Sequence, residues 1–574
     1  MNFNSYLFVF VFYPVALAGF YWLKKRGEAG ASSTARRAGA HAVPLSARRA
    51  ADGAGCPSAA LKWWLILLSL FFCGFGHLDS LAVFAASMAG NYALLRLIFR
   101  AKESAAQSGR VLRNDAGQTG GNPRGSAAQS GGASRNRTVS GAGRGRPVRG
   151  LVTLGVLFNL AMLGFFKYFN FLAGTVLALF GEGFTAQSIV LPLGISFFTF
   201  QQISLLVDAG RGEVGACSPT DYLVYITFFP KLLMGPITTY QEMKPQFDAM
   251  AARPWESGRF LRGGALFVLG MAKKCILAQN LEPAANFVFT NITSLSFLEG
   301  LLGMLCYLAE LYFDFSGYCD MGCGLCQMMG LDLPVNFRSP LQSIHIVDYW
   351  QRWHITLSRF FTKYVYIPLG GNRRGTARMC ANIFLIFLLS GLWHGAAWTY
   401  VVWGALQGAL YVPVKLASNA RRKAAARRGE SVRPLPGPVA LAARLWNFVV
   451  IAATLVFFRS ATVGDALRYF QTMGESLLGG TALRLGTAFL KTFQADELWY
   501  VFKGLGLGGW AASPYLCMAV LLGVSFYFAL FSPNAAQLAK RQRFTVRGAL
   551  VYAVLFAWCV MTYASVSTFV YVNF

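Results

Sequence analysis

The feature that most constrains this chain is a series of long apolar blocks spread along almost its whole length. A helix needs about 20 consecutive, mostly apolar residues to cross the hydrocarbon core of a bilayer. Backbone groups exposed to lipid must be hydrogen-bonded within their own segment, so these blocks predict transmembrane helices. We therefore expect an all-α polytopic membrane protein, a single domain over residues 1–574, with on the order of ten or more spans. The blocks are 3–23, 61–76, 81–99, 151–180, 189–207, 260–281, 297–313, 383–412, 439–458, 516–531 and 549–572.

Charge is scarce and unevenly distributed. Only 13% of the residues are charged, whereas soluble domains carry about a quarter. The net charge of +28 is concentrated in three basic stretches between apolar blocks, and these stretches lack interleaved aromatic residues. This is the positive-inside pattern of cytoplasmic loops, with attraction to anionic membrane lipids, and it argues against nucleic-acid binding. We expect residues 24–60 and 100–149, which are low in complexity, to be disordered, and residues 417–438 to form a third basic cytoplasmic loop.

The order of apolar and basic segments predicts an orientation. The first apolar block precedes its basic cluster, the reverse of a secretory signal, and no A-x-A-like cleavage site follows. We expect an uncleaved first span with the N-terminus outside. The basic segment 539–548 should be cytoplasmic, the mixed-charge segment 459–510 should face outward, and the final span should leave the C-terminus outside.

The three closely spaced cysteines of "GYCDMGCGLCQMMG" share one helix face. Cys319, Cys323 and Cys326 stand at i, i+4 and i+7. A zinc site would need a fourth soft ligand, and the nearby sequence supplies none. We interpret them as small residues that pack a helix–helix contact, and we expect no metal.

Only five histidines are present, so candidates for proton chemistry can be compared directly. His41 falls in a basic loop and His77 in the turn between the second and third blocks. His394 lies in "FLLSGLWHGAAW", where a polar group is costly unless it is paired or faces a cavity. That cost makes His394 a functional candidate, with room beside it at the small residues "GAA". A neutral imidazole bonded to a neighbouring helix is the alternative reading.

The segment 348–375, "DYWQRWHITLSRFFTKYVYIPLGGNRRG", mixes aromatic rings with cations. It predicts an amphipathic or re-entrant element and not a simple span, with a tight bend at "PLGGN". Its cations could complement an anionic substrate such as a nucleotide-bearing thioester. A positively charged interfacial anchor is the alternative.

Several stretches, in order along nearly the full chain, resemble the membrane-bound O-acyltransferases of the bacterial polysaccharide-modifying branch. They include "NLAMLGFFKYFNF", "LPLGISFFTFQQISLLVDAGRG", "FFPKLLMGPI" and "LYFDFSGYCDMGCGLCQMMG", and the most specific are "RWHI" and "WHG" with "PLGGN" between them. The resemblance implies a ring of helices around a thin central region with a tunnel. It also implies that His394 is catalytic and that His354 is functionally needed. It further implies a bacterial inner-membrane location, a partner among the extracytoplasmic esterase-like (SGNH-type) acyltransferases, and work alongside polysaccharide biosynthesis machinery.

Acyl transfer from a thioester to a hydroxyl needs a base near neutrality, and imidazole suits that task. We expect His394 to take the proton of the acceptor hydroxyl, in a water-filled passage reachable from both sides of the membrane. His354 would orient the substrate or stabilise the oxyanion. The donor would be acetyl-coenzyme A or an acyl carrier protein, with no bound cofactor. Arg352, Asn372 and Arg373 are candidates for holding the donor. Asp314, Ser316 and Asp320 either line the tunnel or join helices by hydrogen bonds.

Two other functions would also place polar residues at membrane depth. A transporter or flippase is typically built from paired discontinuous helices in related halves, and no such internal repeat is visible. A non-catalytic assembly subunit of an envelope polysaccharide system would keep His394 only for packing.

Overall fold

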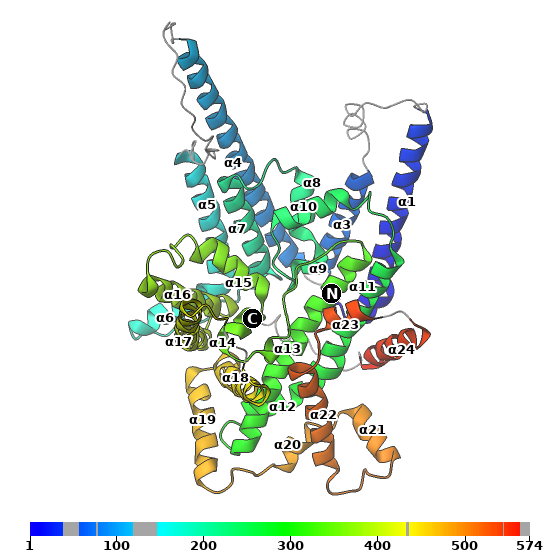
Figure 1. Ribbon diagram of the computed structural model, residues 1–574, viewed down its shortest axis with the longest axis vertical. Helices are drawn as coiled ribbons and strands as arrows, with labels where there is room; N and C mark the ends of the chain where they lie inside the picture. Colours follow the sequence, from blue (N-terminus) through cyan, green and yellow to red (C-terminus); the bar gives the residue numbers. More distant parts are fainter. Residues whose placement is uncertain (38–56, 76–77, 119–145, 432–434, 543–544, 563–574) are drawn as a thin grey trace.

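The computed structural model describes residues 1–37, 57–75, 78–118, 146–431, 435–542 and 545–562. Throughout these residues the regular elements are helices, with no strand, which confirms the all-α prediction (Figure 1). His41, His77 and the C-terminal residues 563–574 lie outside the described part, so the predictions that fall on them stay predictions.

Six helical stretches of the described chain are long and apolar enough to cross a bilayer, and two shorter apolar helices accompany them. Other apolar blocks form helices inside the bundle. The block 297–313 opens the long central helix α13 (Phe297–Met328), whose buried carboxylates make it less apolar than a lipid-facing helix. The six stretches are Phe8–Gly27, Leu78–Gln107, Pro147–Leu179, Thr376–His394, Gly437–Arg459 and Ser513–Leu530, and the shorter helices are Ser58–Gly74 and Val546–Met561.

The helices of the first 249 residues pack largely against one another. These elements are η1 (Phe8–Phe12), α1 (Tyr13–Arg37), α3 (Pro57–Gly74), α4 (Leu78–Gln118), α5 (Arg146–Leu163), η2 (Gly164–Tyr168), α6 (Phe169–Leu179), α7 (Ile195–Arg211), α8 (Pro219–Thr227), α9 (Phe229–Leu232) and α10 (Tyr240–Ala249). The helices α1, α4 and α17 (Trp398–Arg427) continue into segments that the sequence predicts to be basic loops, so residues 24–37, 100–118 and 417–427 are helical. A helix already nucleated by an apolar span extends at little cost through alanine and arginine, which are good helix formers.

The centre of the bundle is a close contact between α13 and α11 (Ser257–Ala272). A Cβ on Gly270 would lie 2.7 Å from the carbonyl oxygen of Gly317, and one on Gly263 would lie 2.8 Å from that of Gly324. Small residues therefore let the two backbones touch, as in other membrane helix pairs. The π-helix η3 (Lys273–Ala278) and α12 (Gln279–Thr290) continue α11 along the same helix.

The segment between α13 and the next long helix is irregular. It contains η4 (Pro340–Gln342), α14 (Ile346–Trp350), α15 (Ile355–Phe361) and the π-helix η5 (Thr362–Tyr366). The sequence predicts such a broken element for residues 348–375. The residues at the start of this segment, among them Trp353, His354 and Leu357, are buried within the protein. Non-helical backbone is tolerated at membrane depth in such buried places. The helices α16 (Thr376–His394) and α17 follow as a closely packed pair.

The remaining helices are α18 (Gly437–Arg459), α19 (Val463–Leu478), α20 (Thr487–Lys491), α21 (Asp496–Gly504), α22 (Ser513–Leu530), α23 (Ala535–Arg541) and α24 (Val546–Met561). In Figure 1, α1 and α4 project at one end of the molecule, and α19, α20 and α21 lie at the other. The ends of α1 and α4, where the first two basic stretches begin, thus lie opposite the mixed-charge segment, and the side of the membrane that each end faces stays a prediction.

Candidate active site

His394 is the last residue of α16, and its imidazole is enclosed by aromatic rings from three helices. The ring centroid lies 5.0 Å from that of Trp393, 5.3 Å from that of Trp403 on α17 and 5.2 Å from that of Phe458 on α18. The residue is only 4% exposed. The C-terminal end of an apolar helix therefore presents a titratable ring inside the bundle.

The end of α16 is held by two side chains of η2. The Lys167 Nζ donates to the backbone carbonyls of Trp393 at 2.6 Å and His394 at 3.0 Å. The Tyr168 hydroxyl donates to the carbonyl of Leu392 at 2.7 Å. These carbonyls have no partner within the helix, and a cation is favourable at a helix C-terminus. Lys167 thus fixes the backbone that carries the imidazole. Sequence reasoning missed this residue, although a lone lysine in the apolar block 151–180 was a visible signal.

His354 is also buried, and its position is set by an uncommon backbone conformation. It lies just before α15 with φ of +43°, a left-handed conformation that is rare for a residue with a side chain. Its ring centroid is 6.0 Å from that of Trp393. The two histidines predicted from the sequence therefore both contact the indole of Trp393.

Asn336 fixes the hydrogen-bonding state of His354. The Asn336 Oδ1 accepts from the backbone N–H of Thr356 at 3.2 Å and from its hydroxyl at 2.8 Å, which identifies that atom as the carbonyl oxygen. The Nδ1 of His354 lies 3.1 Å from the same oxygen. An amide oxygen only accepts, so Nδ1 carries the proton of the neutral ring and Nε2 carries the lone pair. Asn336 had no motif around it that sequence reasoning could use.

A cavity of about 530 Å³ lies beside the two histidines, between the irregular segment and the α16–α17 pair. Its wall includes Ser390, one turn before His394, and Ile355, next to His354. Arg359 and Lys415 add positive charge to an otherwise mostly apolar and aromatic wall.

Neither histidine lines this cavity, and the described residues enclose His394, so the water-filled passage predicted there is not open among them. The reason is aromatic packing: the rings of Trp393, Trp403 and Phe458 cover the imidazole. The room predicted beside "GAA" is also filled, because a Cβ on Gly395 would lie 2.0 Å from the ring of Tyr400.

The other predicted donor-binding residues lie away from the cavity wall. Arg352 pairs with Asp348 one turn earlier, at 2.7 Å. Asn372 and Arg373 are exposed in the turn before α16. That turn needs glycine at positions 370 and 371, where φ is +99° and +54°. A role for these three side chains in holding a donor stays a prediction.

The predicted tunnel residues of α13 contact lysines of η3. Asp314 pairs with Lys274 at 2.6 Å, and both side chains are almost completely buried. Lys273 pairs with Asp320 at 2.6 Å and donates to Ser316 at 3.2 Å. These contacts join two helices, and substrate binding by the same residues stays a prediction. Within the described chain, no three His, Cys, Asp or Glu side chains are grouped as metal ligands would be.

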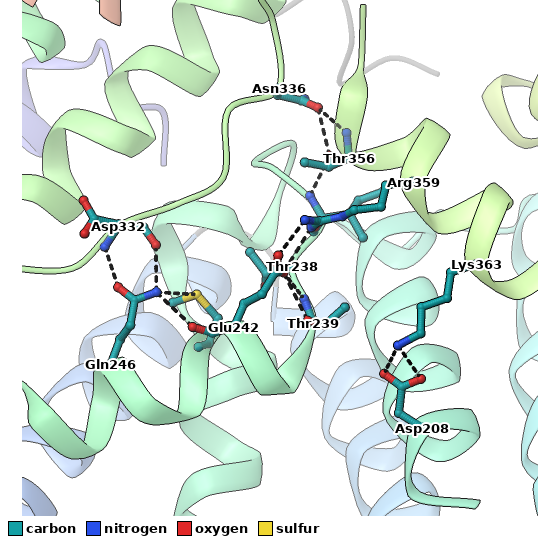
Figure 2. A network of polar contacts seen from close by, with 12 residues as sticks. Asp208, Thr238, Thr239, Glu242, Gln246, Asp332, Asn336, Thr356, Arg359 and Lys363 are labelled. Carbon is teal, nitrogen blue, oxygen red and sulfur yellow. Dashed lines mark hydrogen bonds and ion pairs between the residues drawn. The ribbon is translucent and has the colours of Figure 1, made fainter. Parts of the chain in front are cut away.

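Figure 2 shows the polar network that positions the segment carrying His354. Arg359 donates to Glu242 at 2.5 and 3.0 Å, and Lys363 pairs with Asp208 at 3.0 Å and Glu213 at 2.7 Å. Burial raises the pKa of the Glu213 carboxyl, but the hydrogen bond and charge of Lys363, the charge of Arg211 and the hydrogen bond from Gln241 together outweigh it, so the pKa of Glu213 is lowered. These carboxylates, which sequence reasoning missed, come from α7, the loop after it and α10.

Comparison with known proteins places the site inside a matched region. The model of the membrane-bound O-acyltransferase family matches residues 150–458, which include both histidines. A peptidoglycan O-acetyltransferase of Helicobacter pylori is 31% identical over 82% of this chain and 79% of its own length. A probable alginate O-acetylase of Azotobacter vinelandii is 37% identical over 56% of this chain and 62% of its own. A teichoic acid D-alanyltransferase of Bacillus subtilis is 31% identical over 38% of this chain and 57% of its own.

Proposed function

Because the chain belongs to the membrane-bound O-acyltransferase family, we propose that it moves a short acyl group, with acetyl our first candidate, from a cytoplasmic thioester to an extracytoplasmic polysaccharide. The protein is a membrane-embedded acyltransferase, and the donor, the acceptor, the direction of transfer and the catalytic base are the proposed parts. The observation that supports the proposal best is a buried imidazole at a lysine-capped helix end, one turn from a cavity with cationic residues in its wall.

His394 is the proposed general base. An alcohol is a poor nucleophile while it is protonated, so the imidazole takes the hydroxyl proton as the oxygen attacks the thioester carbonyl. The C–S bond then breaks, and the imidazolium returns the proton to the leaving thiolate. Such a base contributes roughly 10²–10⁴-fold to the rate. The products are an ester and a free thiol, and the reaction neither consumes nor releases a proton.

His354 is proposed to orient the acceptor by accepting a hydrogen bond from a hydroxyl other than the one that His394 deprotonates. Its Nδ1 proton is directed to Asn336, so its Nε2 is an acceptor and suits a hydroxyl better than an oxyanion. Of the two roles that the sequence leaves open, this hydrogen-bonding state favours orientation.

The 530 Å³ cavity is the proposed donor site. Its volume falls within the range of about 300–1,000 Å³ usual for small-molecule sites. The apolar wall suits the arm of a thioester, and Arg359 and Lys415 suit its phosphates. Reaction then requires the rings around His394 to move, since the cavity ends one turn short of the imidazole.

The location and the partner follow from the same proposal. We expect the protein in a bacterial inner membrane with both termini outside. The acyl group would pass to an extracytoplasmic esterase-like acyltransferase that works with the polysaccharide machinery.

The test is mass spectrometry of O-acyl esters on envelope polymers from cells with the unmodified chain, with His394→Ala, and with no chain. We expect esters only with the unmodified chain, at equal protein levels. His345→Asn is the matched control, because His345 caps α14 through its ring and asparagine is also a good cap. Wild-type ester content with His394→Ala would remove the proposed base. Equal content with and without the chain would remove the proposed function.

A further inference from the structure

Two buried indole N–H groups next to His394 have no acceptor. Within the described residues, Nε1 of Trp393 and Nε1 of Trp403 are buried donors without a hydrogen-bond partner. Leaving a buried donor unsatisfied is costly, so each such group calls for an explanation, and a catalytic role is one. Both rings contact the imidazole of His394.

The fold does satisfy the indole beside them. Trp350 Nε1 donates to Gln407 at 3.1 Å, and Gln407 in turn donates to Thr454 at 2.7 Å. Gln407 lies on α17, one turn after the unsatisfied Trp403, and Thr454 lies on α18. The lack of a partner at Trp403 is therefore a local property of the ring next to the imidazole.

The indole of Trp403 contacts both a wall residue of the donor cavity and the imidazole of the base. Its ring centroid is 6.0 Å from that of Trp350, which lines the 530 Å³ cavity, and 5.3 Å from that of His394. Trp393 is instead packed on its other sides by Phe197, Phe200 and His354. A thioester carbonyl that advances from the cavity past Trp350 toward His394 therefore reaches the indole of Trp403.

The reaction needs a hydrogen-bond donor at this place. Attack on the thioester carbonyl converts its oxygen into an oxyanion, which buried N–H donors stabilise more strongly than they stabilise the ground state. His354 Nε2 is an acceptor in the hydrogen-bonding state fixed by Asn336, and Lys167 Nζ is engaged by the carbonyls at the end of α16. In this structure, neither group is therefore placed to donate a hydrogen bond to the oxyanion.

We propose that the indole N–H of Trp403 donates a hydrogen bond to the oxyanion formed during acyl transfer. This rests on the proposed function, with His394 as the base. The hydroxyl proton goes to His394, the carbonyl oxygen takes up the negative charge and accepts the indole hydrogen bond, and the charge leaves with the thiolate as the C–S bond breaks. The indole N–H is not itself transferred.

The test uses the full-length chain in inverted membrane vesicles that contain the native acceptor. Radiolabelled acetyl-coenzyme A is the donor probe, and polymer-bound label gives initial rates as a function of donor concentration. Trp403→Phe keeps an aromatic ring and removes the N–H. Because phenylalanine is smaller, a second variant carries benzothienylalanine at position 403, which keeps the two-ring shape and replaces N–H by sulfur. Trp446→Phe, at a ring that is 70% exposed on α18, is the matched control.

We expect the benzothienylalanine variant to lose about 10²–10³-fold in kcat, the loss usual for one oxyanion donor, with KM changed less than threefold. Its midpoint of thermal unfolding should stay equal or rise, since an unsatisfied buried donor has been removed. Trp403→Phe should show the same loss of kcat, and Trp446→Phe none. A kcat within threefold of wild type in the benzothienylalanine variant would overturn the proposal for Trp403 and leave the proposed function intact. No label transfer by the unmodified chain would instead count against the proposed function itself.

Discussion

The buried ion pair between Lys274 and Asp314 allows a quantitative test of what the charges of the central helix do. Their atoms are 2.6 Å apart, and the side chains are 1% and 0% exposed. Removing one partner of such a pair leaves an uncompensated charge in a low-dielectric interior, at a cost of about 3–5 kcal/mol. Replacing both partners by apolar residues of similar volume is often neutral or stabilising by roughly 1–4 kcal/mol.

We therefore expect Asp314→Leu and Lys274→Met each to lower the free energy of unfolding by about 3–5 kcal/mol, and the double variant to restore it to the wild-type value or above. The assay is equilibrium unfolding of the purified chain in mixed micelles, read as a double-mutant cycle. Glu430→Gln is the control, because its partner Arg428 lies 3.5 Å away and both side chains are mostly exposed. Breaking an exposed pair should cost about 0–1 kcal/mol.

Measuring acyl transfer on the same variants distinguishes the two roles left open for Asp314. If the carboxylate only joins helices, the double variant regains both stability and acylation. If it also binds substrate, the double variant is stable but inactive. Single variants that cost under about 1 kcal/mol, or a double variant as unstable as either single one, would refute the electrostatic reasoning.

Two further substitutions probe how the site is held. Lys167→Met should remove two hydrogen bonds from a charged donor, each worth roughly 1.5–3 kcal/mol before desolvation of the lysine is counted, and release the end of α16. Acylation should then fall about 100-fold, because a displacement near 1 Å can cost that much. Wild-type acylation in this variant would contradict the role of the lysine cap. Gly391→Ala should destabilise the α16–α17 contact by about 1–3 kcal/mol, because the new Cβ would lie 2.3 Å from the carbonyl oxygen of Tyr400. Gly474→Ala on α19, where a Cβ would meet no atom within 4 Å, should instead raise the free energy of unfolding by about 0.5–1 kcal/mol. Equal unfolding free energies for the two glycine variants would show that the close approach of α16 and α17 is not energetically important.

Much of the fold could be predicted from local sequence. The apolar blocks predicted membrane helices because the bilayer fixes both the length and the polarity of a span. The irregular segment 348–375 could be recognised because aromatic and cationic residues alternate there without a clean apolar run. The extension of α1, α4 and α17 beyond their apolar spans could not, because helix propagation into alanine- and arginine-rich sequence depends on the span that precedes it.

The sequence by itself determined that a few polar residues, His394 above all, would lie at membrane depth, since burial of a polar group in an apolar helix is visible in the residues themselves. Only the tertiary structure decided their partners. Lys167 meets the carbonyl of His394 across 227 residues of chain, and Asn336 meets His354 across a helix break. Local periodicity indicates which face of a helix a residue occupies. A hydrogen bond or an ion pair between helices depends instead on how those helices pack. That packing is set by close glycine contacts and aromatic rings distributed along the whole chain.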